Sequence, residues 1–372
     1  MEEKANETAA EVTPKQGKKW KKLLLWAVFI LANVGAVLFA LLSDIPKAGG
    51  EAAETAAKIL SENWHYLLLA LAGVAGYFLF RTLTHLVMMR FLTGKSRFGL
   101  CLSVTVLGKY YDYITPLATG GQPFQIYYLR KKDIPEGAAI SLPLAEYTIS
   151  RFAFVVLSLA AIILNAANVF GTGAMITGLM LAATIVGIVL NCAFPALIIV
   201  FLFSRTFCSK LIKFVVGVLK VLRLTKKPDK LYDRIMSSLE KTIQSVRAVA
   251  KRKRIIYCFA FALLSHLAMC SIAYFCLKAF GYEGGAWFGE WAYVVIMCLF
   301  VYNSVTFIPT PGTSGAADLS FYWLFGAALA AGTGAFAMLT WRFISYYLFI
   351  AFGLVQMLII AVRKKRAGEQ QV

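Results

Sequence analysis

Long apolar runs separated by short polar segments are the dominant pattern of this chain. A helix needs about 20 apolar residues to cross the hydrocarbon core of a bilayer, which is roughly 30 Å thick. Seven runs approach or exceed this length and predict membrane-spanning helices: Leu23 to Leu42, Tyr66 to Met89, Leu144 to Leu164 with an apolar lead-in from Ala138, Ile176 to Phe203, Ile255 to Phe280, Trp291 to Phe307 and Ala335 to Val362. The pattern therefore predicts an all-α integral membrane protein.

An eighth apolar run is shorter than the others. Leu319 to Ala331 has thirteen residues and would span roughly 20 Å as a helix, so it crosses only with help from the segment before it. Basic residues precede Leu23 and follow Val362, which favours a cytoplasmic location for both chain ends. Two ends on one side require an even number of crossings. We expect eight, and six crossings with re-entrant segments also fit.

The polar segments set the organisation of the chain. They delimit a basic tail expected to be disordered, a single transmembrane bundle and a cytoplasmic tail, at residues 1–22, 23–363 and 364–372. Residues 43–64 are acidic and are expected to form an external loop. Residues 204–255 contain 15 Lys or Arg and three acids, which predicts a cytoplasmic insert. Apolar positions recur every three to four residues over 228–250, which predicts an amphipathic helix.

Composition supports the membrane assignment. The chain is 59% hydrophobic and 15% charged, whereas soluble domains carry about 25% charged residues. The net charge of +19 is concentrated in segments beside the apolar runs, where it sets orientation and attracts anionic lipid rather than nucleic acid. Seven cysteines lie mostly in apolar runs, and the three histidines are scattered. We therefore predict no metal site and no cofactor.

Two segments interrupt the apolar pattern with proline, glycine, hydroxyl groups and a carboxylate. We call residues 111–125 the first break and residues 307–318 the second break. Irregular backbone persists at membrane depth only where protein covers it or where it lines a polar cavity. The two breaks therefore mark the expected functional site.

The first break predicts a half-helix, a turn and a new helix start. Pro116 and Pro123 lack a backbone donor, and Gly120 and Gly121 permit positive φ. The new helix start would offer free N–H groups suited to a phosphate. A structural kink flanked by snorkelling lysines is the alternative. The residues expected here to bind a lipid head group are Lys109, Asp112, Thr115, Gly120, Gly121, Gln122 and Gln125.

The second break predicts a tight turn between two helices. Pro309 and Pro311 end the preceding run, and Gly312 and Gly315 permit the turn. Its Gly-Thr-Ser-Gly order differs from the nucleophile elbow of serine hydrolases, and no suitably placed histidine supports a triad, so we expect no catalytic residue. The expected head-group ligands here are Asn303, Thr310, Gly312, Ser314 and Asp318.

Charged side chains inside the apolar runs add further candidates. Such residues are costly in a membrane and usually face the bundle interior. Glu146 and Arg151 are five residues apart and point about 140° away from each other on a helix, so neither is expected to be the other's only partner. Arg342 and Tyr346 share one helix face. Arg342 needs an anion, which is Asp318, Glu146 or a lipid phosphate.

This combination of motifs resembles the lysylphosphatidylglycerol synthase transmembrane family, also described as the flippase part of multiple peptide resistance factor. The resemblance covers roughly residues 20–365. It rests on Tyr111-Asp112-Tyr113-Ile114-Thr115-Pro116, on Gly120-Gly121-Gln122-Pro123-Phe124-Gln125-Ile126-Tyr127-Tyr128-Leu129-Arg130, on Glu146 and Arg151, and on Pro309-Thr310-Pro311-Gly312-Thr313-Ser314-Gly315-Ala316-Ala317-Asp318.

The resemblance implies a helical bundle that flips aminoacylated or other charged phospholipids across the bacterial plasma membrane, a process linked to antimicrobial peptide resistance. The partner it implies is a phospholipid, anionic or aminoacylated. Cationic head groups would meet Asp112, Glu146 or Asp318, and phosphate would meet Arg151, Arg342 or a half-helix N-terminus. The resemblance also leaves room for a separate aminoacyltransferase and for a homo-oligomer.

Two alternatives remain beside translocation. In bifunctional family members a soluble domain transfers lysine from tRNA, and we expect no such domain here because the chain ends at Val372. The alternatives are a membrane-embedded synthase that transfers lysine to phosphatidylglycerol, and an accessory anchor for such an enzyme. The chain also departs from many relatives, which have adjacent Glu and Arg in the third span and glutamate in place of Asp318.

Overall fold

The computed structural model describes residues 51–166, 178–203, 255–306 and 308–369, with isolated positions between 206 and 253. The predicted tail, the first predicted span and most of the basic insert lie outside these residues. The predictions about them therefore stay predictions.

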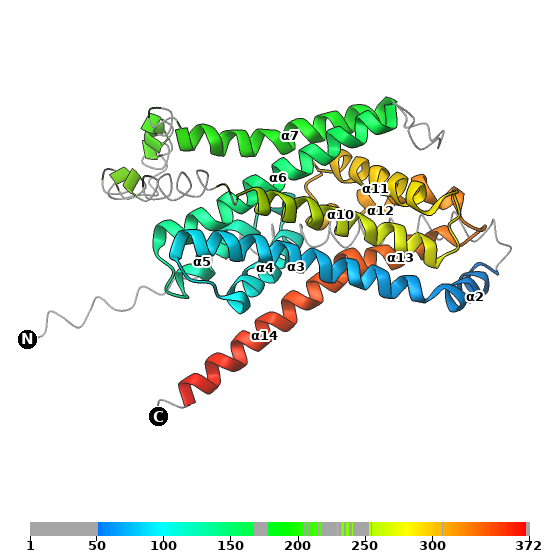
Figure 1. Ribbon diagram of the computed structural model, residues 1–372, viewed down its shortest axis with the longest axis horizontal. Helices are drawn as coiled ribbons and strands as arrows, with labels where there is room; N and C mark the ends of the chain where they lie inside the picture. Colours follow the sequence, from blue (N-terminus) through cyan, green and yellow to red (C-terminus); the bar gives the residue numbers. More distant parts are fainter. Residues whose placement is uncertain are drawn as a thin grey trace, which may run out of the picture.

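Every regular element in the described residues is helical, so the predicted fold class is confirmed (Figure 1). The α-helices are α2 (Ala52–Asn63), α3 (His65–Thr93), α4 (Phe98–Ile114), α5 (Gly121–Arg130), α6 (Glu136–Ala166), α7 (Gly178–Phe203), α10 (Ile255–Ala279), α11 (Trp287–Ser304), α12 (Ala316–Phe325), α13 (Gly334–Arg342) and α14 (Leu348–Glu369). Short 3-10 turns lie at η2 (Pro116–Ala118), η3 (Pro311–Thr313) and η4 (Gly326–Ala328), and a π-helical turn, η5, covers Phe343–Tyr347.

Four helical segments are long and apolar enough to cross a membrane. They are His65–Thr93, Glu136–Ala166, Ile255–Ala279 and Gly334–Arg363. Each coincides with a predicted span, and α7 contains a shorter apolar helix, Met180–Ala193. The chain is therefore a multi-pass membrane protein, while the count of eight crossings stays a prediction.

Three segments differ in detail from the predictions. The expected loop at 43–64 contains α2, because its alanine-rich sequence has high helix propensity. Helix α6 begins at Glu136, two residues before the predicted lead-in at Ala138, so the lead-in and the span from Leu144 form one helix that includes Pro143. Helix α12 begins at Ala316 and ends at Phe325, where the 3-10 turn η4 follows it, instead of running to Ala331. Its ten residues span about 15 Å, half of a bilayer core.

Helices α3 and α10 pack along each other and form the centre of the bundle (Figure 1). A Cβ atom added at Gly73 would lie 3.0 Å from Ile272 Cγ1 and 3.1 Å from the carbonyl oxygen of Ala268. Small residues at such crossings let helix backbones approach closely in a membrane. Helices α7 and α11 approach in the same way where Gly187 meets the backbone of Asn303.

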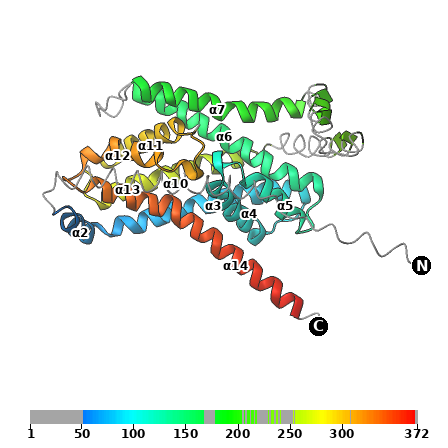
Figure 2. The same cartoon turned by 180° about the vertical axis from the view of Figure 1, so that it is seen from behind.

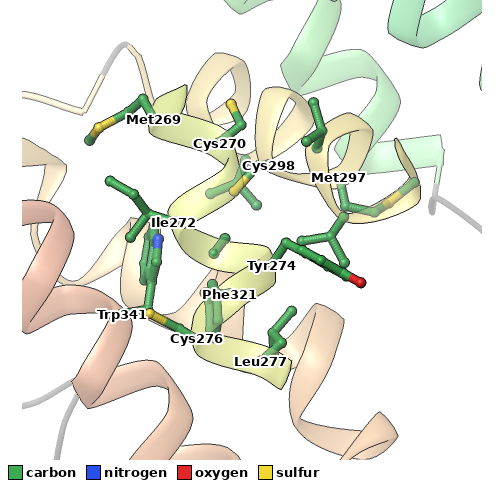
Figure 3. Close-up of a cluster of buried hydrophobic side chains, with 14 of the residues drawn as sticks. Met269, Cys270, Ile272, Tyr274, Cys276, Leu277, Met297, Cys298, Phe321 and Trp341 are labelled. Atoms are coloured by element: carbon green, nitrogen blue, oxygen red, sulfur yellow. The ribbon is translucent and has the colours of Figure 1, made fainter. Parts of the chain in front are cut away.

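A buried apolar cluster joins α10, α11, α12 and α13 (Figure 3). The rings of Phe321 and Trp341 stack within it, with centroids 4.5 Å apart and planes 10° apart. This stack ties α12, which follows the second break, to α13. Because Trp341 directly precedes Arg342 and is itself buried, the core fixes the start of that charged side chain.

The C-terminal helix α14 extends away from the bundle at its far end (Figure 2). Its first part packs on α4, where Gly353 lies against the ring of Tyr110. Gln356 donates a hydrogen bond of 2.8 Å to the hydroxyl of Ser103 in the same interface. This contact holds α4 and thereby the start of the first break.

Candidate functional site

The two breaks lie against each other in the folded chain. The turn η2 of the first break contacts the turn η3 of the second break, and η3 also contacts α4. Segments that are far apart in sequence therefore form one irregular region inside a helical bundle.

The two turns have the same backbone conformation. In each, an extended threonine precedes a proline, with ψ of 143° at Thr115 and 146° at Thr310. The next two residues of each turn adopt the left-handed region: Leu117 (φ 56°), Ala118 (φ 51°), Gly312 (φ 60°) and Thr313 (φ 52°). Non-glycine residues held there cost of order 1–3 kcal/mol each and concentrate at functional sites.

This likeness has a sequence signal that the expectations above missed. Both breaks read Thr-Pro-x-x-(Thr or Ser)-Gly, over Thr115–Gly120 and Thr310–Gly315. The identical spacing of threonine, proline and glycine explains why both turns fold alike.

Each turn is closed by a carboxylate from its own break. Asp112 Oδ1 accepts a hydrogen bond of 2.9 Å from the backbone N–H of Gly121, the first residue of α5. Asp318 Oδ2 accepts one of 2.8 Å from the backbone N–H of Gly315, just before α12. Both acids therefore cap helix starts, and no room remains at Gly121, where a Cβ atom would overlap Asp112.

Three more predicted residues support the first turn. Thr115 Oγ1 accepts the N–H of Gly120 at 2.9 Å. Gln125 is buried and donates from Nε2 to the carbonyl of Val104 at 3.1 Å, with its side chain lying over Gly108. These hydrogen bonds to backbone groups stabilise the first turn and its packing on α4.

A cavity of about 860 Å³ opens beside the two turns. This volume falls in the usual range of ligand sites, roughly 300–1,000 Å³. Seven of the predicted site residues line it: Lys109, Asp112, Gln122, Arg151, Thr310, Gly312 and Arg342. The other nine lie behind the lining: Thr115, Gly120, Gly121, Gln125, Glu146, Asn303, Ser314, Asp318 and Tyr346.

Arg81 also lines the cavity and was missed from the sequence. It pairs with Glu146 through contacts of 2.7 Å (Nη1 to Oε1) and 3.2 Å (Nη2 to Oε2), and it donates to Ser150. The Glu146 side chain is only 2% exposed. Arg81 is the one Lys, Arg, Asp or Glu in the Tyr66 to Met89 run. A lone charge in an apolar span is a candidate site residue, so the sequence did carry a signal for it.

Arg342 binds the second break. Its Nε lies 3.0 Å from Asp318 Oδ1, and its Nη2 donates to the carbonyl of Gly312 at 3.0 Å and to Ser314 Oγ at 2.5 Å. The guanidinium also lies over the ring of Tyr346, 4.2 Å from its centroid. Of the anions considered for Arg342, Asp318 is the one it contacts, and Glu146 belongs to Arg81.

Arg151 is held by neutral groups. Its Nη1 donates to Asn191 Oδ1 at 2.7 Å, and its guanidinium lies 4.9 Å from the ring centroid of Tyr147. The amide of Asn191 in turn donates toward Asn303 Oδ1 at 3.4 Å and Thr306 Oγ1 at 3.2 Å. Asn303 is therefore connected to the cavity-lining Arg151 through Asn191.

Lys109 is surrounded by aromatic rings. Its Nζ lies 4.1 Å from the ring centroid of Tyr113, 5.2 Å from that of Tyr77 and 5.9 Å from that of Phe349. Within the described part of the chain, neither Lys109 nor Arg151 has a carboxylate oxygen within 4.0 Å. The cavity therefore carries positive charge that the surrounding described residues do not neutralise by direct pairing.

Comparisons with known proteins identify the family of this chain. Residues 23–353 match the family model described as lysylphosphatidylglycerol synthase TM region. The chain is also similar to a UPF0104 membrane protein of Archaeoglobus fulgidus, with 23% identity over 319 residues, which cover 83% of this chain and 90% of that protein. The family match spans both breaks and every residue of the cavity lining. The chain belongs to the lysylphosphatidylglycerol synthase transmembrane family, a family of membrane proteins tied to lipid handling.

Proposed function

We propose that this protein moves the head groups of charged phospholipids across the plasma membrane through the cavity between the two breaks, with both chain ends in the cytoplasm. The observation that carries this proposal is the meeting of two irregular segments at a charged cavity inside an apolar bundle. Charged groups are costly at membrane depth and persist there for function. A polar path for the head group with acyl chains left in the bilayer accounts for both features.

Lipid transfer in proteoliposomes tests the proposal. Vesicles would contain phosphatidylglycerol with a fluorescent head group or chain label, and a membrane-impermeant quencher would report the label in the outer leaflet. Purified protein is expected to bring inner-leaflet label to the quencher faster than empty vesicles do. Equal rates with and without protein would contradict the proposal.

A pair of variants on α6 separates cavity transport from nonspecific leakage. Leu144 lines the cavity, whereas Ile163 is 66% exposed on the same helix. Leu144→Trp is expected to fill part of the cavity and slow transfer, while Ile163→Trp is expected to behave as the wild type. Equal slowing by both variants would contradict a path through the cavity.

The family description also carries the word synthase. That activity would make this chain a lysyl transferase acting on phosphatidylglycerol. Incubation of the purified protein with aminoacyl-tRNA and phosphatidylglycerol tests it, and formation of aminoacylated lipid would favour the synthase over the translocator.

A further inference from the structure

Two of the three acids around the cavity are paired with arginines, and the third, Asp112, uses one oxygen within the protein. Asp112 accepts the backbone N–H that opens α5. Glu146 and Asp318 pair with Arg81 and Arg342, at 2.7 Å and 3.0 Å. A cationic ligand at Glu146 or Asp318 would have to displace the arginine partner and leave a buried charge without its counterion, which costs several kcal/mol.

The cations are less fully engaged. A lysine ammonium has three donors and an arginine guanidinium has five. Lys109 Nζ lies among three ring faces, with the negative charge of Asp112 nearby, and Arg151 uses one of its donors on Asn191. Gln122 lines the same cavity. Of the five charged residues in the lining, Arg81, Lys109, Arg151 and Arg342 are cations and Asp112 is an acid, so donors on cations outnumber the acceptors.

The surroundings of the two cations orient them while using only one of their donors, the Arg151 Nη1 that binds Asn191. Ring faces attract a cation electrostatically. Lys109 Nζ lies over the ring of Tyr113, and the guanidinium of Arg151 lies over the ring of Tyr147. Donors that point at a cavity from a cation form charge-assisted hydrogen bonds to phosphate, which are roughly twice as strong as neutral ones. Arginine additionally binds phosphate in a bidentate manner.

We infer that the cavity selects a lipid head group of net negative charge, a phosphodiester without an ammonium group, and that Lys109 and Arg151 are the residues that contact its phosphate. This inference rests on the proposed function and names its substrate class. A lysyl or other aminoacyl head group would place its ammonium among four cations, with Asp112 as the one acid of the lining to receive it. The structure thus favours the anionic over the aminoacylated lipid.

Binding measurements on the whole protein test this selectivity. Purified protein would be titrated with phosphatidylglycerol and, separately, with lysyl-phosphatidylglycerol of the same acyl chains, and bound lipid would be counted by native mass spectrometry. We expect at least tenfold tighter binding of phosphatidylglycerol. Equal or tighter binding of the lysylated lipid would overturn the inference.

Variants assign the selectivity to the two cations. Arg151→Gln and Lys109→Met are each expected to remove most of the preference for phosphatidylglycerol, and Arg151→Lys is expected to retain part of it. Lys95→Gln, at an exposed lysine outside the cavity, is the matched control and should leave the preference unchanged. Thermal unfolding of each variant shows whether it is folded. A folded Arg151→Gln/Lys109→Met double variant with undiminished preference would overturn the assignment.

Two further outcomes separate the inference from the proposed function. Glycerol phosphate that binds as tightly as the lipid would keep the phosphate assignment and contradict lipid transport. Transfer of phosphatidylglycerol and lysyl-phosphatidylglycerol at equal rates, with equal affinities, would keep the transport proposal and overturn the selectivity.

Discussion

Tyr113 and Tyr346 connect the two breaks through their hydroxyl groups. Tyr346 donates to the backbone carbonyl of Tyr113 at 3.1 Å, and Tyr113 donates to the carbonyl of Ser345 at 3.0 Å. Their rings lie 4.8 Å apart. Ser345 and Tyr346 belong to the π-helical turn η5, and such turns are frequent at functional sites. This pair therefore fixes the first break against the segment that carries Arg342.

Removing either hydroxyl is expected to loosen this connection. Hydrogen bonds between membrane helices contribute about 0.6 kcal/mol on average and up to roughly 1.7 kcal/mol, so Tyr113→Phe and Tyr346→Phe should each lower stability by an amount in that range. Unfolding in detergent measures the effect. The double variant should cost less than the sum, because the two residues act on one contact. A strictly additive result would mean that they act independently.

The turn of the second break should not tolerate a side chain at Gly312. Its φ is +60°, and an added Cβ atom would overlap the ring of Tyr346. Gly312→Ala is therefore expected to lower both the unfolding temperature and the rate of lipid transfer. Gly289→Ala is the control, since no atom lies within 4 Å of a Cβ atom placed there. Partial rescue of Gly312→Ala by Tyr346→Ala would identify the ring as the cause. Equal behaviour of Gly312→Ala and Gly289→Ala would contradict the prediction.

The pair between Arg81 and Glu146 is expected to be among the most sensitive contacts in the bundle. Glu146→Gln leaves the guanidinium of Arg81 without its carboxylate, and breaking a buried pair in this way costs about 3–5 kcal/mol. Replacing both residues by leucine should cost less than the single change, because no unpaired charge remains. A double-mutant cycle on unfolding measures the coupling. A double variant less stable than Glu146→Gln would contradict this account.

Variants of Asp112 separate two roles, which are contact with a cationic head group and capping of the start of α5. From the sequence it was expected to meet a cationic head group, whereas the structure shows it capping Gly121. Asp112→Asn retains an acceptor oxygen and should preserve folding and transfer of phosphatidylglycerol. Asp112→Ala removes the cap, at a cost of roughly 1 kcal/mol, and should slow transfer. Loss of transfer in Asp112→Asn with normal stability would show that its charge is required.

Several features could be predicted from the sequence because they depend on local pattern. Apolar runs located the four long spans, since length and hydropathy are sufficient to identify a crossing helix. Proline and glycine located both turns, and Asp318 was among the partners considered for Arg342. The Thr-Pro-x-x-(Thr or Ser)-Gly repeat was equally local, and reading the two breaks side by side would have found it.

Other features could not be predicted because they depend on how the helices pack. The choice of Arg81 as the partner of Glu146 requires α3 to lie beside α6. The ring-lined position of Lys109 requires Tyr77 and Phe349 to converge on α4 from both ends of the chain. Likewise, the division between residues that line the cavity and residues that support them, such as Gln125, is set by side-chain direction within the bundle.

In the proposed function, the cavity between the two breaks receives a phospholipid head group. The most direct test is a cryo-electron microscopy structure of the protein in phosphatidylglycerol nanodiscs. We expect density for a lipid phosphate inside the cavity, in contact with Lys109 and Arg151, with acyl chains extending into the bilayer. Lipid density found only on the outer surface of the helices, with no lipid atom in contact with Lys109 or Arg151, would contradict the proposal.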